Sequence, residues 1–337
     1  MKIAILTSHF LESKKETNIH YIFNILKKAN HEIDWVTYPV SLSLLRKHNS
    51  FKRKAFFKGY FKQKFIFVLF PPYIFTNKVF RFFLSFSFFR NFSKKEYDLL
   101  ITEGYQSSYI YTNFCFKKLI HRMSDDEKYL RFFSDEEKIY KKMTDSADKI
   151  WSVLEKTSKN FDNIIYLPNP SVHEKIIINN NKKNEAVYVG SNKFNVSLVK
   201  ALAKEGIKIN IYSEKQNIFH KNIKYHGLVD KKNLPKELSQ YKVGIIPFDL
   251  DEKNKFMEIP LKTFDYIASG LHIIMFSSSD EIKTNIIINV DNQEDFINIT
   301  KKKMFEEPNY FEYQKVLEEK SFKTFSKSIE AFLKEIF

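Results

Sequence analysis

The 337-residue chain is too long for one ordinary hydrophobic core and fits two domains of roughly 150 residues each. Its single cysteine, Cys115, excludes an internal disulfide framework, and the apolar run that opens the chain is too short for a secretory signal. We therefore expect a cytoplasmic protein. The net charge is +15, so the position of the excess positive charge along the chain is informative.

The first forty residues have the pattern of a strand, a helix and a second strand. These are "KIAILTSHF", "ETNIHYIFNILKKAN" and "HEIDWVTYP". Elements in this order form a βαβ unit, the building block of parallel sheets. His9 follows the first strand and His20 lies on the helix; either could line a binding site, although a satisfied histidine is the commoner explanation.

The next segment, from Trp35 to Lys95, contains no acidic residue. It carries 13 of the 15 net positive charges and 15 of the 35 phenylalanines, interleaved with the cations. This composition is typical of a membrane-surface element, in which rings enter the headgroup boundary and cations meet anionic lipid. Its longest uncharged stretch, between Lys64 and Lys78, is shorter than the roughly 20 residues that a membrane span needs. We predict that residues 46–95 bind an anionic membrane surface, with a buried aromatic core as the alternative. Nucleic-acid binding is not expected, because the aromatic residues that stack on bases usually lie on glycine-bearing sheets, and this segment does not have that pattern.

The alternation of short apolar runs and helical segments continues through "YDLLITEG", "KLIHRM", "DKIWSVL" and "NIIYLPNP". This pattern predicts a parallel sheet covered on both faces. Asp125 and Asp126 follow the strand "KLIHRM", so they could lie at the edge of the sheet where ligands bind, and Asp125 is the first candidate for a general base. Ser124 and Glu127 also form a capping-box pattern, which would explain both aspartates without chemistry.

A polar, asparagine-rich stretch, "SVHEKIIINNNKKNE", interrupts the pattern, which restarts at "AVYVGS". This stretch is the best candidate for a domain boundary. The predicted fold class is therefore α/β, with two tandem Rossmann-like domains facing a cleft. We place the first domain at 1–170, a linker at 171–184 and the second domain at 185–337, with a C-terminal helix that could pack back on the first domain.

Several strands of the second half end in residues suited to a nucleotide. A glycine at a strand end lets the backbone approach a phosphate, and polar side chains there can bind ribose hydroxyls. Each signal alone is weak, but their common position at strand ends predicts one binding edge. The candidates are Gly190, Ser191, Ser213, Glu214 and Gly227.

The stretch "MEIPLKTFDYIASGLHII" predicts a helix that begins at Pro260 and ends before Gly270. Lys262 then lies in the first turn, where unpaired backbone N–H groups disfavour a cation. One explanation is a surface pair with Asp265, one turn along the helix. The other is a bound phosphate held by Lys262, with Asp265 accepting from ribose hydroxyls.

The segment "VGIIPF", an acidic loop and "PLKTFDYIASGLHII" together resemble the donor-nucleotide half of GT-B glycosyltransferases. The opening "ILTSHFLESKKETNIHYIFNILKKANHEIDWVTYPVSLS" is similar to that of the membrane-associated glucuronosyltransferases related to GumK, and "IHRMSDDE" resembles their Arg-x-Ser-Asp segment. The resemblance implies an inverting transfer from a UDP-sugar, with glucuronic acid as a candidate sugar, to a lipid-linked glycan in surface polysaccharide biosynthesis. It also implies no metal, no cofactor, and a peripheral location at the inner face of the membrane.

One departure bears on the mechanism. Retaining members of the wider group carry two glutamates in this region, where the present sequence has Met257 and Asp265, which argues against a retaining mechanism. Strand-end position and the resemblance together predict Asp125 or Asp126 as the base, and a donor site formed by Gly190, Ser191, Ser213, Glu214, Gly227, Pro260, Leu261, Lys262 and Asp265. A sugar-nucleotide epimerase of the same fold and a non-catalytic membrane adaptor with a degenerate site remain as alternatives.

Overall fold

A computed structural model of the chain describes residues 1–12, 17–41, 64–68, 95–104, 107–108, 110–123, 136–155, 163–190, 194–213, 218–250, 259–279 and 285–337. Four predicted site residues lie outside these ranges, namely Asp125, Asp126, Ser191 and Glu214. Most of the predicted membrane-binding segment, 46–95, also lies outside them.

The described chain divides into two compact units. Unit 1 comprises Met1–Pro168 together with Ser326–Phe337, and unit 2 comprises Asn169–Phe325. Residues 169–182, at the start of unit 2, contain neither helix nor strand.

Unit 1 is built on a parallel sheet of seven strands in the order β3-β2-β1-β4-β5-β6-β7. The strands are β1 (Lys2–Thr7), β2 (Glu32–Ser41), β3 (Lys64–Val68), β4 (Glu96–Glu103), β5 (Cys115–Met123), β6 (Lys149–Ser152) and β7 (Ile164–Tyr166). The helical elements are α1 (Asn18–Lys28), the 3-10 turn η4 (Tyr111–Asn113), α5 (Glu136–Ser146) and the larger part of α12 (Phe322–Ile336).

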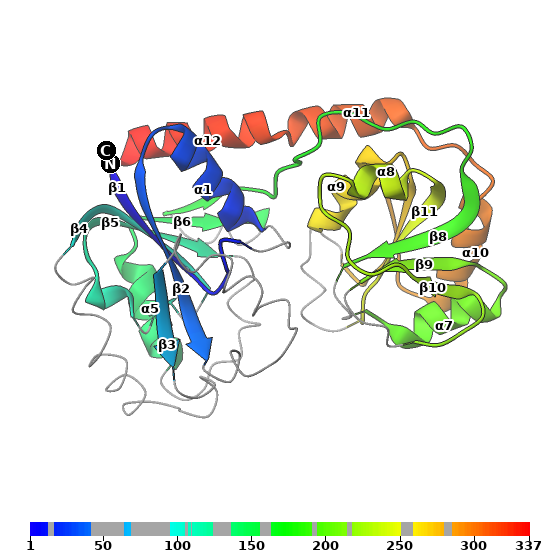
Figure 1. Ribbon diagram of the computed structural model, residues 1–337, viewed down its shortest axis with the longest axis horizontal. Coiled ribbons are helices and arrows are strands. Elements are labelled where there is room, and N and C mark those ends of the chain that lie inside the picture. Colours follow the sequence, from blue (N-terminus) through cyan, green and yellow to red (C-terminus); the bar gives the residue numbers. More distant parts are fainter. Residues whose placement is uncertain are drawn as a thin grey trace. The chain divides into compact units, whose positions relative to one another are not determined.

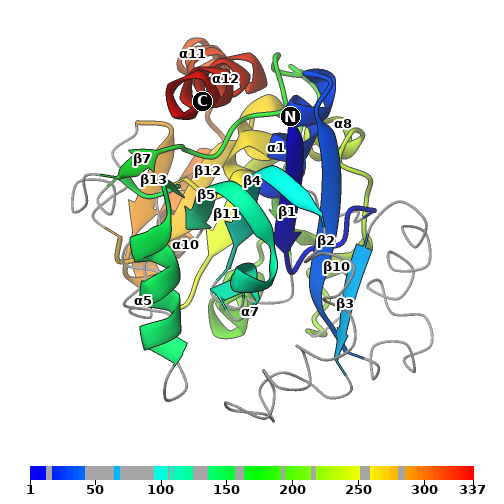
Figure 2. The ribbon, with the colours of Figure 1, turned by 90° about the vertical axis from the view of Figure 1, so that its left-hand side faces the viewer.

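Both faces of this sheet are covered, with α5 on one face and α1 and α12 on the other (Figures 1 and 2). Tyr140 and Met143 of α5 belong to the same buried cluster as Ala4 and Leu6 of β1. On α1, buried apolar residues recur every three or four positions, as a helix needs when one face packs on a sheet.

Unit 2 contains a second parallel sheet, in the order β10-β9-β8-β11-β12-β13. Its strands are β8 (Lys183–Val189), β9 (Ile209–Tyr212), β10 (Ile223–Tyr225), β11 (Tyr241–Pro247), β12 (His272–Phe276) and β13 (Ile287–Val290). Its helices are α7 (Val196–Lys204), α8 (Leu234–Leu238), α9 (Leu261–Ala268), α10 (Gln293–Lys303) and α11 (Tyr310–Glu319).

The helices of unit 2 form two layers (Figure 1). Residues of α7 and α10 share one buried cluster with the sheet, and residues of α8, α9 and α11 share another. The prediction of an α/β fold with two parallel, doubly covered sheets is therefore confirmed. Among the described residues, no helix combines the length and the apolar character needed to cross a bilayer.

Candidate functional site

Helix α9 of unit 2 carries the lysine that the sequence singled out. Pro260 is its N-cap, with φ −61° and ψ 146°, so the helix begins at Leu261, one residue later than predicted. Gly270 lies just past the other end with φ 62°, the left-handed conformation that commonly ends a helix. Lys262 is the second helical residue, where the free N–H groups of the first turn make the potential positive.

The Lys262 ammonium lies between two aromatic rings. Nζ is 4.4 Å from the ring centroid of Tyr188 and 5.3 Å from that of Phe248. It also donates a hydrogen bond of 3.3 Å to Tyr188 Oη. Tyr188 belongs to β8 and Phe248 follows β11, so the lysine bridges the carboxyl ends of these two neighbouring strands.

Burial lowers the pKa of Lys262 from 10.5 to about 8, and the charge of Asp265 only partly offsets this effect. Among the described residues Lys262 forms no ion pair, because no carboxylate oxygen lies within 4 Å of Nζ. A half-buried cation at a helix amino terminus, without a counter-ion, is a site prepared for an anion.

Gly190 lies beside this ammonium. An ideal Cβ on Gly190 would lie 3.1 Å from Lys262 Nζ and 3.0 Å from Tyr188 Oη, and φ is +145°. Glycine is therefore needed both for its backbone conformation and for the close approach. The structure thus brings together Gly190 and Lys262, which are 72 positions apart in the sequence.

The position of this pair in the sheet fits a ligand site. Strand β9 pairs with one edge of β8, and β11, which comes later in the chain, pairs with the other edge of β8. The gap between β8 and β11 is therefore a topological switch point, and in open parallel sheets ligands bind at the carboxyl ends of the strands at such points.

Asp265 does not pair with Lys262, so the surface-pair explanation is wrong. Its side chain is buried, and Oδ1 lies 2.6 Å from Lys231 Nζ and 2.8 Å from His173 Nε2. Lys231 also donates to Oδ2, at 2.7 Å. Asp265 points to neighbours on other elements because its helical position faces the interior. Ribose binding by Asp265 stays a prediction, and both of its oxygens already accept hydrogen bonds in the structure.

Tyr266 is a part of the site that the sequence reading missed. Its hydroxyl donates to the Ile245 carbonyl at 3.1 Å and accepts from the Val189 N–H at 3.0 Å, so it joins β11 to the end of β8. A Cβ on Gly244 would lie 2.6 Å from the Tyr266 ring, so Gly244 makes room for it. This bridge fixes the strand end from which Gly190 projects.

The other described candidates lie on the same edge of the sheet. Ser213 follows β9 and is buried, and Gly227 follows β10 with φ +74°. The N–H of Gly190 donates to the Tyr212 carbonyl at 3.2 Å, which ties the ends of β8 and β9 together. The contacts that the structure gives Lys262 are with Tyr188 and Phe248, and not with Ser213 or Gly227.

Unit 1 has a polar cluster at the corresponding edge of its own sheet. Glu103 ends β4, and its side chain is 8% exposed. It accepts a hydrogen bond from Thr7 Oγ1 at 2.7 Å and lies 3.6 Å from Arg122 Nη1 and 3.7 Å from His9 Nε2. His9 and Arg122, the arginine of the segment "IHRMSDDE", were noted from the sequence, whereas Glu103 was missed because it only ended the run "YDLLITEG".

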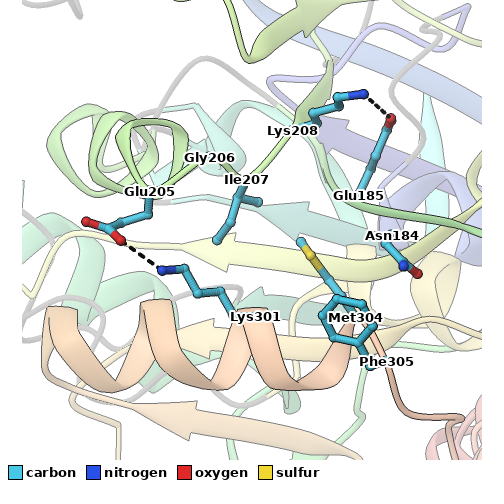
Figure 3. Close-up of a pocket in the computed structure, with 9 residues that line it drawn as sticks. All are labelled: Asn184, Glu185, Glu205, Gly206, Ile207, Lys208, Lys301, Met304 and Phe305. Atoms are coloured by element: carbon cyan, nitrogen blue, oxygen red, sulfur yellow. Dashed lines mark hydrogen bonds and ion pairs between the residues drawn. The ribbon is translucent and has the colours of Figure 1, made fainter.

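A pocket of about 410 Å³ lies elsewhere on unit 2, between the C-terminal ends of α7 and α10 (Figure 3). Ile207, Met304 and Phe305 line it, and ion pairs join Lys301 to Glu205 at 2.8 Å and Lys208 to Glu185 at 3.9 Å. Glu185 belongs to the start of β8, and Ile207 and Lys208 precede β9, so the pocket lies at the amino ends of these two strands, away from Gly190. Within the described ranges, no group of three or more acidic, histidine or cysteine side chains could hold a metal ion.

No family model and no curated protein matches this sequence. Solved structures with a similar fold include a T4 phage BGT variant in complex with UDP-glucose, with a TM-score of 0.53 and 13% identity over 98% of this chain and 99% of that one. An α-glucosyltransferase in complex with UDP and a DNA 13-mer has a TM-score of 0.57 and 13% identity over 99% and 98% of the two chains. The calicheamicin glycosyltransferase CalG4 has a TM-score of 0.50 and 9% identity over 98% of each chain. At these identities the likeness concerns the fold, and the chain has the GT-B fold.

Proposed function

We propose that this protein is a glycosyltransferase that moves a sugar from a UDP-sugar donor. The observation that carries the proposal is Lys262, a half-buried cation that pairs with no carboxylate of the described residues, at the first turn of α9 and beside Gly190. A diphosphate would supply the missing negative charge and could accept hydrogen bonds from the ammonium and from the N–H groups of the helix.

The same arrangement suits the chemistry of transfer. As the bond between the sugar and the diphosphate breaks, negative charge develops on the departing oxygen, and a fixed cation with helix N–H groups stabilises that charge. The aromatic faces of Tyr188 and Phe248 hold the ammonium in place without neutralising it. The neighbours of similar fold include structures in complex with UDP-glucose and UDP, which supports a UDP-sugar as the donor.

The finer parts of the proposal rest on the sequence resemblance. They are an inverting and metal-independent transfer, glucuronic acid as a candidate sugar, and a lipid-linked glycan acceptor for surface polysaccharide. The enzyme would work at the inner face of the cell membrane and contact anionic lipid through residues 46–95. One structure of similar fold contains UDP and Mn²⁺, so metal dependence of the present protein should be measured directly.

Calorimetry of UDP and UDP-sugar binding to the full chain tests the proposal. Lys262→Ala should weaken binding by about 1.5–3 kcal/mol, the size of a lost charge-assisted hydrogen bond. Lys236→Ala is the matched control, because Lys236 is an exposed lysine of the same unit and its loss changes the net charge equally.

The outcomes separate the alternatives. A wild-type chain that binds no UDP would refute the proposal and favour a non-catalytic adaptor. A chain that converts one UDP-sugar into another without an acceptor would be an epimerase. Equal losses of affinity in Lys262→Ala and Lys236→Ala would remove the specific role of Lys262.

A further inference from the structure

Residues 169–182, which we call the strap, run alongside helix α9 within unit 2. Just before the helix, the Ile259 carbonyl accepts a hydrogen bond of 3.4 Å from Asn169 Nδ2. One turn into the helix, Asp265 Oδ1 lies 2.8 Å from His173 Nε2. These two contacts place the strap beside the half of α9 that carries the candidate anion site.

The strap also contacts the carboxyl end of α9. The Ile177 N–H donates to the Ala268 carbonyl at 2.7 Å, and Lys182 Nζ donates to the Gly270 carbonyl. A Cβ on Gly270 would lie 3.1 Å from Lys182 Nζ, so glycine at this position leaves room for the lysine. A cation is favoured here by the negative end of the helix dipole. The strap therefore satisfies carbonyl groups that the helix itself leaves unpaired.

Asp265 is the side chain through which α9 holds the strap. Its side chain is only 3% exposed, and a buried carboxylate is costly unless cations or donors compensate it. One partner is His173 of the strap. The other is Lys231, in the turn before α8, whose Nζ lies 2.6 Å from Oδ1 and 2.7 Å from Oδ2. Asp265 thus joins three segments of unit 2, and both of its oxygens are engaged.

The first turn of α9 needs support from outside the helix. Lys262 places a cation where the helix dipole disfavours one, which weakens this turn as long as no anion is bound. Contacts of the strap with α9 oppose that weakening and keep the turn formed in the free protein. A site that is ordered in advance binds more tightly, because the ligand does not have to order it.

We propose that Asp265 and His173 are positioning residues for the diphosphate site, because their contact fixes the strap against α9 and so holds the first turn, with Lys262, in its binding orientation. The inference rests on the proposed binding of a UDP-sugar. Asp265 then acts through α9 without touching the ligand, in contrast to the ribose contact that the sequence predicts.

The charge of Asp265 allows positioning to be distinguished from electrostatics. Asp265 follows Lys262 by three positions on the helix, so its negative charge by itself repels a diphosphate bound there. If this repulsion were its main effect, Asp265→Asn would strengthen binding of every diphosphate. Loss of positioning weakens binding of every diphosphate instead. Loss of a ribose contact weakens only those ligands that carry the ribose hydroxyls.

The test compares, by calorimetry of the full chain, the Kd of UDP with that of 2′,3′-dideoxy-UDP, which keeps the base and the diphosphate. At pH 7 most of Lys262 is charged, since its pKa is about 8. Asp265→Asn should weaken both ligands by about tenfold, and His173→Phe, which keeps a ring but removes the nitrogen, should do the same. Glu174→Gln is the matched control, since it removes an exposed carboxylate of the strap and should leave both Kd values unchanged.

The double variant separates positioning from a general loss of stability. Asp265→Asn and His173→Phe remove the same contact, so together they should weaken UDP binding no more than Asp265→Asn does alone. Hydrogen exchange of the free protein should be faster in the strap and in the first turn of α9 in both single variants, and slower again in the first turn when UDP is bound. Independent structural defects would instead have additive effects.

Unchanged Kd values in His173→Phe, or tighter binding in Asp265→Asn, would overturn the proposal. A loss in Asp265→Asn that is confined to UDP and spares the dideoxy analogue would assign Asp265 to the ribose instead. Failure of the proposed function is distinct from these results, because the wild-type chain would then bind no UDP. The thermal unfolding midpoint of each variant shows whether its fold is intact.

Discussion

UDP binding should depend on pH through Lys262. In the free protein burial holds the pKa of this lysine at about 8, whereas a bound diphosphate would favour the charged form and raise the pKa again. If only the charged lysine binds, affinity follows the charged fraction, which is about nine-tenths at pH 7 and about one-tenth at pH 9. We therefore expect the Kd to rise about tenfold between these pH values. A return of the pKa to 10.5 would set an upper limit of about 3 kcal/mol for this coupling.

Calorimetry in buffers of different ionisation enthalpy measures the linked protons. The wild-type chain should take up about half a proton per UDP at pH 8 and nearly one at pH 9. Lys262→Met keeps most of the side-chain volume and removes the charge, so it supplies the baseline for the titration of UDP itself. An equal pH dependence of the Kd in the wild type and in Lys262→Met would refute this reasoning.

Ionisation of Lys262 should also make the free energy of unfolding depend on pH, but in the opposite direction to UDP affinity. Its pKa is lower in the folded chain than its ordinary value of 10.5, so the unfolded state binds more protons between pH 8 and 10.5. Its contribution to the free energy of unfolding should therefore increase as the pH rises through this window. The fold thus gives up stability at neutral pH to keep a charged lysine available.

Three further outcomes can be measured independently. Gly190→Ala should weaken UDP binding by about tenfold, since its Cβ would crowd Lys262, while Gly206→Ala introduces a similar positive-φ strain in open space and should leave calorimetric affinity unchanged. Gly244→Ala should lower the free energy of unfolding by about 1–3 kcal/mol in denaturant titrations, because the new Cβ meets the Tyr266 ring. Replacement of Lys52, Arg53, Lys54 and Lys58 by glutamine should reduce sedimentation with anionic liposomes, because each cation contributes about 1 kcal/mol to the free energy of membrane binding. A wild-type protein that stays in the supernatant at low salt would exclude the membrane role.

Local signals predicted α9 well, and long-range contacts account for what was missed around it. Pro260 and Gly270 located the two ends of the helix to within one residue, since both act on the backbone next to them. The partners of Asp265 were invisible in the sequence, because His173 is 92 positions away and Lys231 is 34 positions away. An ion pair between residues four or fewer positions apart can be inferred from helix geometry. The partners of a buried charged residue, in contrast, depend on the tertiary fold.

The proximity of Gly190 and Lys262 could be predicted from the sequence, for a different reason. Parallel strands present their carboxyl ends at one edge, so residues that follow such strands are brought together whatever their separation. The same rule applies to His9 and Glu103, but Glu103 was missed because it ended an apolar run and carried no motif. Strands β3 and β13 were also missed.

Unit 1 is made of two pieces of chain, and this has a consequence for its synthesis. Residues Ser326–Phe337 belong to unit 1, where Phe332 lies 6.5 Å from the Trp151 ring and Glu335 pairs with Lys149 at 2.9 Å. All of unit 2 leaves the ribosome before these residues do. Unit 1 therefore cannot be completed until Ser326–Phe337 have emerged, although N-terminal units ordinarily fold first, and unit 2 is the first that can be completed. A nascent chain interrupted shortly before Ser326 would hold a finished unit 2 joined to a unit 1 whose buried Trp151 still lacks part of its cover.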